Sequence, residues 1–206
     1  MSEIKPILNR EAWLEAAVEE LRPLFRGHGH EIPAVRVSVG WPSSGGLGKA
    51  KRAIGQCWGG KASEDGKPQL FISPLLDAPC AAQGVLATLV HELVHVAVGT
   101  EAKHGKVFAK LAEKMMLEGK PTSTSASLDL LERLKLVEEK LGPFPHSKIV
   151  PQPSDKKAQT TRMKKAECDC CGFTIRLARK WADIGIPECP VDKKPMTLDA
   201  RLPDEE

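Results

Sequence analysis

Apolar side chains recur every three or four residues between Trp13 and Phe25, which is the period of one face of an α-helix. Asn9 is a suitable N-cap in front of this pattern, and Gly27 is suited to end it. Three short segments follow that are typical of β-strands, at residues 35–39, 53–58 and 69–72. The loop rich in proline, serine and glycine between the first two indicates a hairpin. The pattern therefore predicts one helix and then a small, three-stranded antiparallel sheet.

A second helix is expected from Asp77, as its N-cap, to Gly99. This segment is apolar nearly all round, so we expect it at the centre of the fold. Further helices are expected at about residues 105–117 and 127–141, each followed by a glycine and a proline. Because the strands do not alternate with helices in a βαβ rhythm, the expected fold class is α+β.

The chain divides by composition into three parts. Residues 1–150 hold the predicted helices and sheet, and residues 151–164 form a basic linker rich in Pro, Ser, Lys, Gln and Thr. Residues 165–206 contain four of the six cysteines and an acidic tail. We therefore expect one main domain, a linker and a small C-terminal module.

Composition narrows the class of protein. With 41% apolar and 28% charged residues among 206, the chain has the balance of a globular protein. Its most apolar stretch, Val85 to Val98, is interrupted by His and Glu and is too short to span a bilayer, so no membrane partner is expected. Residues 1–13 lack an apolar signal core, which indicates the cytoplasm. Cysteines kept reduced there are more often metal ligands than disulfide partners.

The central predicted helix carries a His-Glu-x-x-His motif at residues 91–95. Residues four apart share a helix face, so His91 and His95 can bind one Zn²⁺, and Glu92 is close enough to act on a water at the metal. A catalytic zinc normally takes a third protein ligand. His104 is favoured, while Glu113 and Glu118 remain alternatives.

The motif could also arise by chance on a solvated helix. Its flanks argue against that reading, because they include Leu86, Leu89, Val90, Leu93 and Val94. Polar side chains in so apolar a helix are costly to bury unless they are paired or bind a metal. A zinc site is therefore the preferred interpretation.

His91-Glu92-x-x-His95 followed by His104-Gly105-x-x-Phe108 resembles the SprT-like family of zinc metalloproteases, which includes the Spartan proteases that degrade proteins crosslinked to DNA. The resemblance covers roughly residues 8–119 and 165–198. It implies a small zincin-like protease domain and a C-terminal zinc ribbon. It also implies one catalytic zinc, held by His91, His95 and His104, with Glu92 as the general base that activates a zinc-bound water.

The cysteine cluster has the spacing of a zinc ribbon. Cys168 and Cys171 form a CxxC pair, and Cys189 follows after residues 172–188. The fourth position is Asp192 where a cysteine is expected. Three readings stay open: Asp192 binds a second, structural zinc through oxygen, Cys170 replaces it, or the module holds no metal.

The net charge of +3 is unevenly distributed, since residues 156–180 carry +6. The basic side chains are Lys156, Lys157, Arg162, Lys164, Lys165, Arg176, Arg179 and Lys180. Together with Trp181 they are typical of a nucleic-acid contact, and DNA, single-stranded or bound to protein, is the expected partner. The alternative is a solvated linker without a partner. Lys49, Lys51 and Arg52 form a weaker patch of the same kind.

The leading interpretation is a zinc-dependent endopeptidase of SprT-like type, directed to DNA or DNA-bound proteins by its basic module, with a protein or peptide as substrate. One alternative is a non-proteolytic, zinc-containing adaptor that binds nucleic acid. Another is a zinc hydrolase that acts on a non-peptide amide, because the motif specifies the chemistry and not the polymer.

Overall fold

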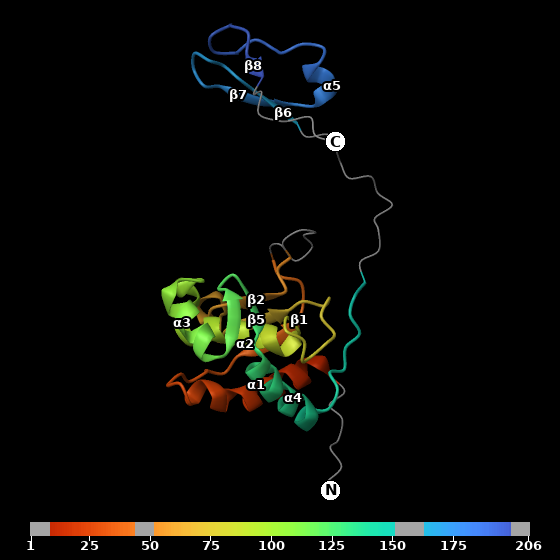
Figure 1. Ribbon diagram of the computed structural model, residues 1–206. Helices are drawn as coiled ribbons and strands as arrows, with labels where there is room; N and C mark the ends of the chain where they lie inside the picture. Colours follow the sequence, from red (N-terminus) through yellow and green to blue (C-terminus); the bar gives the residue numbers. More distant parts are fainter. Residues whose placement is uncertain (1–8, 44–51, 151–162, 199–206) are drawn as a thin grey trace. The chain divides into compact units, whose positions relative to one another are not determined.

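The computed structural model describes residues 9–43, 52–150 and 163–198, and it divides the chain into two compact units (Figure 1). Unit 1 is residues 1–151 and unit 2 is residues 152–206. Helices and small sheets together give a mixed α+β protein, as expected. No helix in the described parts of the chain is long and apolar enough to cross a membrane. Most of the predicted linker, residues 151–162, lies outside the described residues.

Helix α1 (Arg10–Arg26) forms where the apolar period predicts it. The Asn9 side chain accepts hydrogen bonds from the backbone N–H groups of Glu11 and Ala12, so Asn9 is the N-cap, and Gly27 is the C-cap. The apolar face is buried, and the Nε1 of Trp13 donates to the carbonyl of Gly142 at 3.0 Å. This bond joins the start of α1 to the end of the last helix of unit 1.

The three predicted strands are present as β1 (Arg36–Val39), β2 (Gly55–Trp58) and β3 (Gln69–Ile72), but their predicted pairing was wrong. The order is β1-β3-β2, with β1 parallel to β3 and β2 antiparallel to it. The sheet is therefore mixed, and β1 and β2 do not form a hairpin. β3 takes the central position because its Leu70 and Ile72 side chains are both fully buried in the core.

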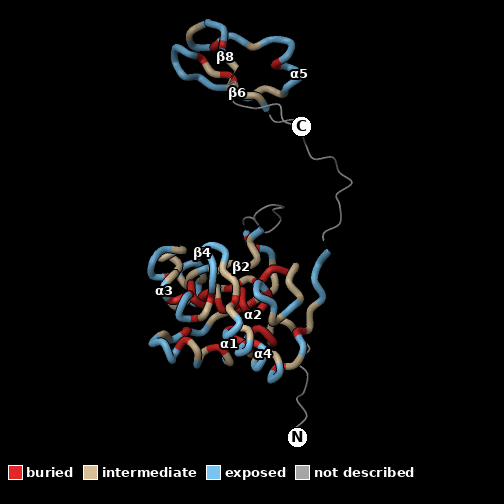
Figure 2. The backbone as a smooth tube through the Cα atoms, in the orientation of Figure 1, coloured by how far each residue is buried: buried red, intermediate tan, exposed pale blue. Residues whose placement is uncertain are grey.

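Helix α2 (Val85–Val98) is central, but it begins eight residues after Asp77. The backbone N–H groups of Val85 and Leu86 donate to the carbonyls of Ala78 and Pro79, so the preceding residues fold back as turns over the start of the helix. Gly84 is needed there, since a Cβ would lie 2.3 Å from the Ala78 carbonyl oxygen. α2 packs against β2 and β3, and Figure 2 shows buried residues concentrated around it.

The next predicted helix is shorter than expected. Helix α3 (Lys106–Lys114) ends early, and β4 (Leu117–Lys120) and β5 (Ser123–Ala126) form an antiparallel hairpin instead. Positive φ angles at Met116 (60°) and Gly119 (94°) turn the chain out of the helix. Helix α4 (Leu128–Leu141) follows as predicted, with the Ser127 side chain as its N-cap.

Unit 2 contains a small sheet of three strands and one short helix. The strands are β6 (Lys164–Glu167), β7 (Thr174–Leu177) and β8 (Thr197–Leu198), in the order β7-β6-β8. Helix α5 (Arg179–Ala182) follows β7. The core of the unit consists of Ala166, Cys168, Cys189 and Met196, so two of the cysteines are buried in its centre.

Candidate metal centre

Three imidazoles converge on one face of α2. His91 and His95 project from the same face of the helix, and His104 reaches them from the turn before α3. The Nε2 of His104 lies 3.3 Å from the Nε2 of His91 and 3.2 Å from the Nε2 of His95. Glu113 and Glu118 are not part of this group. Among the sequence alternatives, the structure thus brings His104 to the motif.

The separations between these nitrogens fit a metal ion. Zinc binds imidazole nitrogen at about 2.0–2.1 Å, and tetrahedral geometry then places two ligand nitrogens about 3.3 Å apart. A hydrogen-bonding account is less satisfactory, because a neutral His104 Nε2 has one proton at most and faces two acceptors. The three side chains therefore fit a divalent metal with a coordination position left for water or substrate.

The turn between α2 and α3 explains why the third histidine lies nine residues after the second. Gly99 ends α2 with φ of 85°, a short 3₁₀ helix follows at Thr100–Ala102, and Lys103 has φ of 47°. Such a φ is rare and strained for a residue with a side chain. Two left-handed positions within five residues reverse the chain and return His104 to the face of α2.

Burial keeps the imidazoles neutral. It lowers the pKa of His91 to about 3, with the charges of His95 and His104 adding to the effect. Burial likewise lowers the pKa of His95 to about 4, and it lowers the pKa of His104, the most exposed of the three. A neutral imidazole has a free lone pair, so protons do not compete with a metal near neutral pH.

Glu92 lies beside this centre and is only 5% exposed. Burial raises the pKa of its carboxyl to about 8, and a nearby divalent cation favours the ionised form instead. The carboxylate contacts β2 at Gly55, where a Cβ would lie 2.3 Å from Oε1 of Glu92. A glycine is therefore required for strand and carboxylate to approach so closely.

Thr124 belongs to the candidate site, and the sequence analysis did not identify it. Its Oγ1 lies 2.8 Å from Nδ1 of His91, and it belongs to β5 of the hairpin that was expected to be a helix end. When Nδ1–H donates to this hydroxyl, the lone pair of His91 resides on Nε2, which faces the other two imidazoles. Thr124 is therefore positioned to fix the tautomer and the orientation of His91.

The centre opens into a cleft of about 500 Å³. One wall is β2 with the residues just before it, and the other is the turn and the start of β5, residues 122–124. Within the described residues β2 pairs with β3 alone, so its outer edge faces this cleft. Arg52 and Lys103 lie at the rim, whereas Lys49 and Lys51 of the weaker basic patch are outside the described residues. An extended peptide could enter with its backbone along β2.

A second group of metal ligands lies in unit 2 and consists of Cys168, Cys171, Cys189 and Asp192. The Sγ atoms of Cys171 and Cys189 are 3.5 Å apart, and Sγ of Cys168 lies 3.3 Å from Oδ2 of Asp192. A tetrahedral zinc would place two sulfurs about 3.8 Å apart and a sulfur and an oxygen about 3.5 Å apart. The four atoms fit a closed metal site.

Two matching turns hold these ligands. In the first, the N–H of Cys168 donates to the carbonyl of residue 173, and the N–H of Gly172 donates to the carbonyl of Cys168. In the second, the N–H of Cys189 donates to the carbonyl of residue 194, and the N–H of Lys193 donates to the carbonyl of Cys189. Gly172 and Lys193 both have positive φ. Asp192 thus occupies the position that Cys171 has in the first turn.

Cys170 is placed outside the second ligand group. It is exposed, and Nζ of Lys194 lies 3.3 Å from its Sγ. Cys170 lies between Cys168 and Cys171 in the turn, but its side chain is exposed and does not belong to the ligand group. Of the two candidates for the fourth ligand, Asp192 is the one that the structure brings to the other three.

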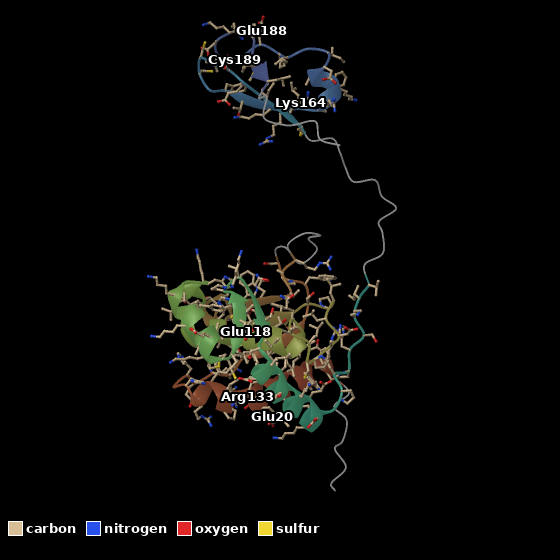
Figure 3. The ribbon with its side chains drawn as sticks, in the orientation of Figure 1. Glu20, Glu118, Arg133, Lys164, Glu188 and Cys189 are labelled. Atoms are coloured by element: carbon tan, nitrogen blue, oxygen red, sulfur yellow. The ribbon has the colours of Figure 1, made fainter. Side chains whose placement is uncertain are left out.

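The basic side chains predicted to contact nucleic acid are partly neutralised by acids. Lys165 pairs with Glu167 at 2.5 Å, while Lys164 and Arg179 both lie 4.0 Å from Asp183. Arg176, Lys180 and Trp181 are exposed, and Nζ of Lys180 lies 4.7 Å from the centre of the Trp181 ring (Figure 3 shows the unit with Lys164 labelled). Lys156, Lys157 and Arg162 lie outside the described residues.

No family model, no curated protein and no solved structure matched the chain. The two ligand groups and the cleft are therefore the features from which its function is inferred.

Proposed function

We propose that the chain is a zinc-dependent endopeptidase of the SprT-like, zincin-like kind. The observation that carries the proposal is the set of three converging imidazoles with a buried glutamate in the same cleft. A purely structural metal site has no need of Glu92, and closed structural sites normally use four protein ligands. The third imidazole and the open cleft together favour catalysis.

Zn²⁺ bound to the three imidazoles would lower the pKa of a water and polarise the scissile carbonyl. Glu92 is suited to the proton transfers, because its carboxylate is buried beside the histidines and faces the cleft. It would accept a proton from the attacking water and return it to the departing amine. Thr124 would keep the Nε2 lone pair of His91 directed at the metal.

The outer edge of β2 would position the substrate. An extended peptide that pairs with a strand edge gains backbone hydrogen bonds and is held irrespective of its side chains. The chain contains no tyrosine, so a phenol cannot stabilise the oxyanion. Thr122 and Ser123 line the cleft and carry hydroxyls that could donate to the oxyanion.

The test is a comparison of Glu92→Gln with the unchanged chain, with cleavage of an unfolded protein and self-cleavage as readouts, with and without single-stranded DNA. We expect zinc content to be retained and cleavage to be lost. Glu118→Gln is the matched control, because Glu118 is exposed and lies outside the ligand group. Cleavage by zinc-loaded Glu92→Gln at the original rate would refute the mechanism.

The second candidate function is a non-proteolytic adaptor that binds nucleic acid. It is favoured by the exposed Arg176, Lys180 and Trp181 of unit 2, which suit phosphate contacts and base stacking. An adaptor would bind single-stranded DNA and retain zinc, yet cleave no protein and none of the small amides offered beside it. Cleavage of the small amides alone would instead indicate a hydrolase that acts on non-peptide amides.

A further inference from the structure

Helix α3 carries a positively charged hollow that is separate from the cleft. Its volume is about 320 Å³. Its lining consists of three lysines, one histidine and three apolar side chains: Lys106, Lys110, Lys114, His30, Val98, Val107 and Leu111. This α3 hollow contains no carboxylate among its lining residues.

The lysines form a row because they are spaced by four residues. Each step of four advances about 6 Å along a helix, so the row extends over about 12 Å. All three side chains are exposed, and in the described parts of the chain none of them forms an ion pair. Figure 3 shows nitrogen-tipped side chains projecting outward around α3. Glu113, the acid of this helix, does not line the hollow.

The apolar side chains of the α3 hollow indicate which kind of anion would bind there. Val107, in the first turn of α3, is 63% exposed, and Leu111, one turn further along the same face, is buried. An unpaired nucleotide combines an anionic phosphate with a flat, apolar base, so a strand can place phosphates on the lysines and a base on Val107. A purely acidic peptide has no group for the apolar floor.

The position of α3 gives such binding a use. The helix starts directly after His104, and Lys103 lies at the rim of the cleft. Phe108 of α3 packs against the three imidazoles, whereas the lysine row lies on another face of the helix and comes nearest to the candidate metal centre at Lys106, two residues after His104. Any protein attached to a strand bound along this row would have a high effective concentration at the cleft.

We propose that the α3 hollow binds single-stranded nucleic acid, with phosphates on Lys106, Lys110 and Lys114 and a base against Val107. This surface belongs to unit 1 and is distinct from the basic residues of unit 2. The proposal goes beyond the proposed function, because binding here requires neither cleavage nor the C-terminal module.

The experiment uses the full chain and the triple substitution Lys106→Gln, Lys110→Gln and Lys114→Gln. Binding of a labelled oligothymidylate is measured by fluorescence anisotropy across a salt series. Loss of three phosphate contacts should make the slope of log K against log salt shallower by about 2, since each single-strand contact contributes about 0.7. Affinity at low salt should fall roughly tenfold or more.

The matched control replaces Lys61, Lys67 and Lys140 by glutamine. It removes the same charge from unit 1, but these lysines pair with Glu101, Asp65 and Glu20. We expect it to leave the salt slope unchanged. Val107→Ala should weaken binding of the oligothymidylate but not of inorganic polyphosphate, which has no base.

Three results would overturn the proposal. The first is an unchanged affinity and salt slope in the lysine variant. The second is an equal loss in the control, which would show an effect of net charge alone. The third is loss of polyglutamate binding while oligothymidylate binding is retained, which would assign the hollow to an acidic protein. None of these readouts depends on Glu92, so failure here is distinguishable from failure of the peptidase proposal.

Discussion

Gly55→Ala tests the close approach between β2 and Glu92. The new Cβ would lie 2.3 Å from Oε1 of Glu92 and 2.6 Å from Cγ2 of Thr88, where ordinary contacts begin at about 3.4 Å. Thr88 cannot move easily, because its hydroxyl donates to the Gly84 carbonyl at 2.8 Å and its side chain is buried. The Glu92 carboxylate must therefore shift by about 1 Å, or β2 must move away from α2.

The structure gives two expected magnitudes. Overpacking at a buried contact destabilises a protein by about 1–3 kcal/mol, which lowers the urea midpoint of unfolding. A shift of about 1 Å in a catalytic group costs about a hundredfold in rate. Zinc content should stay unchanged, because the atoms nearest to the new methyl group belong to Glu92 and Thr88 and not to the three imidazoles.

The assay combines urea unfolding of the zinc-loaded protein with cleavage of an unfolded protein substrate. Gly27→Ala is the matched control: Gly27 has an ordinary φ of −60°, and a Cβ there lies 3.4 Å from the nearest atom. The control should stay within about 0.5 kcal/mol of the unchanged chain and cleave at the same rate. Stability and cleavage both unchanged in Gly55→Ala would show that strand and carboxylate are not in contact. Lower stability with full cleavage would show that β2 moves and that the Glu92 carboxylate keeps its position.

Three further predictions concern the metal sites and one ion pair. Thr124→Val should weaken zinc binding about 10–100-fold in a chelator competition, while Thr124→Ser should restore it; equal affinity for both variants would exclude the hydroxyl. Asp192→Cys should slow the loss of the second zinc to a chelator, since closed sites favour thiolate, and a faster loss would place Asp192 outside the site. The hydrogen bonds from Arg36 hold the pKa of the Asp65 carboxyl below its usual range. This carboxylate therefore stabilises the folded state fully when the pH is above about 4, the pKa of Asp65 in the unfolded chain. The stabilisation is lost as the pH falls through the lower pKa of the folded state. Asp65→Asn should therefore unfold at a lower urea concentration than the unchanged chain at pH 7, and the difference should shrink as the pH falls below about 4. A constant difference across pH would contradict this.

Local signals in the sequence were sufficient for the elements that depend on neighbouring residues. Asn9 and Ser127 are the N-caps of α1 and α4, and the period of apolar residues marks the buried face of α1. The His91 and His95 pair depends only on the helical repeat. These features are predictable because the interactions that determine them lie within one or two turns of helix.

Features that depend on distant contacts were not predictable in this way. The parallel pairing of β1 with β3 places Leu70 and Ile72 in the core of unit 1, and no local pattern reveals which strands become neighbours. The hairpin at residues 117–126 was not predicted: Gly119 and Pro121 were interpreted as the stop of a helix ending at about residue 117, although they suit a tight turn equally well. Thr124 was missed for the same reason, since its role depends on where that hairpin lies.

The outer edge of β2 has a consequence for the solubility of the protein. A strand edge with open backbone groups recruits any extended chain, so an edge that can dock a substrate can also start self-association. β2 is only four residues long and begins with Gly55, a residue type that weakens strands. The Gln56 side chain is moreover bonded to Ser43. A longer β-branched strand at this position would hold peptides more tightly, and it would also turn the cleft into a template for aggregation.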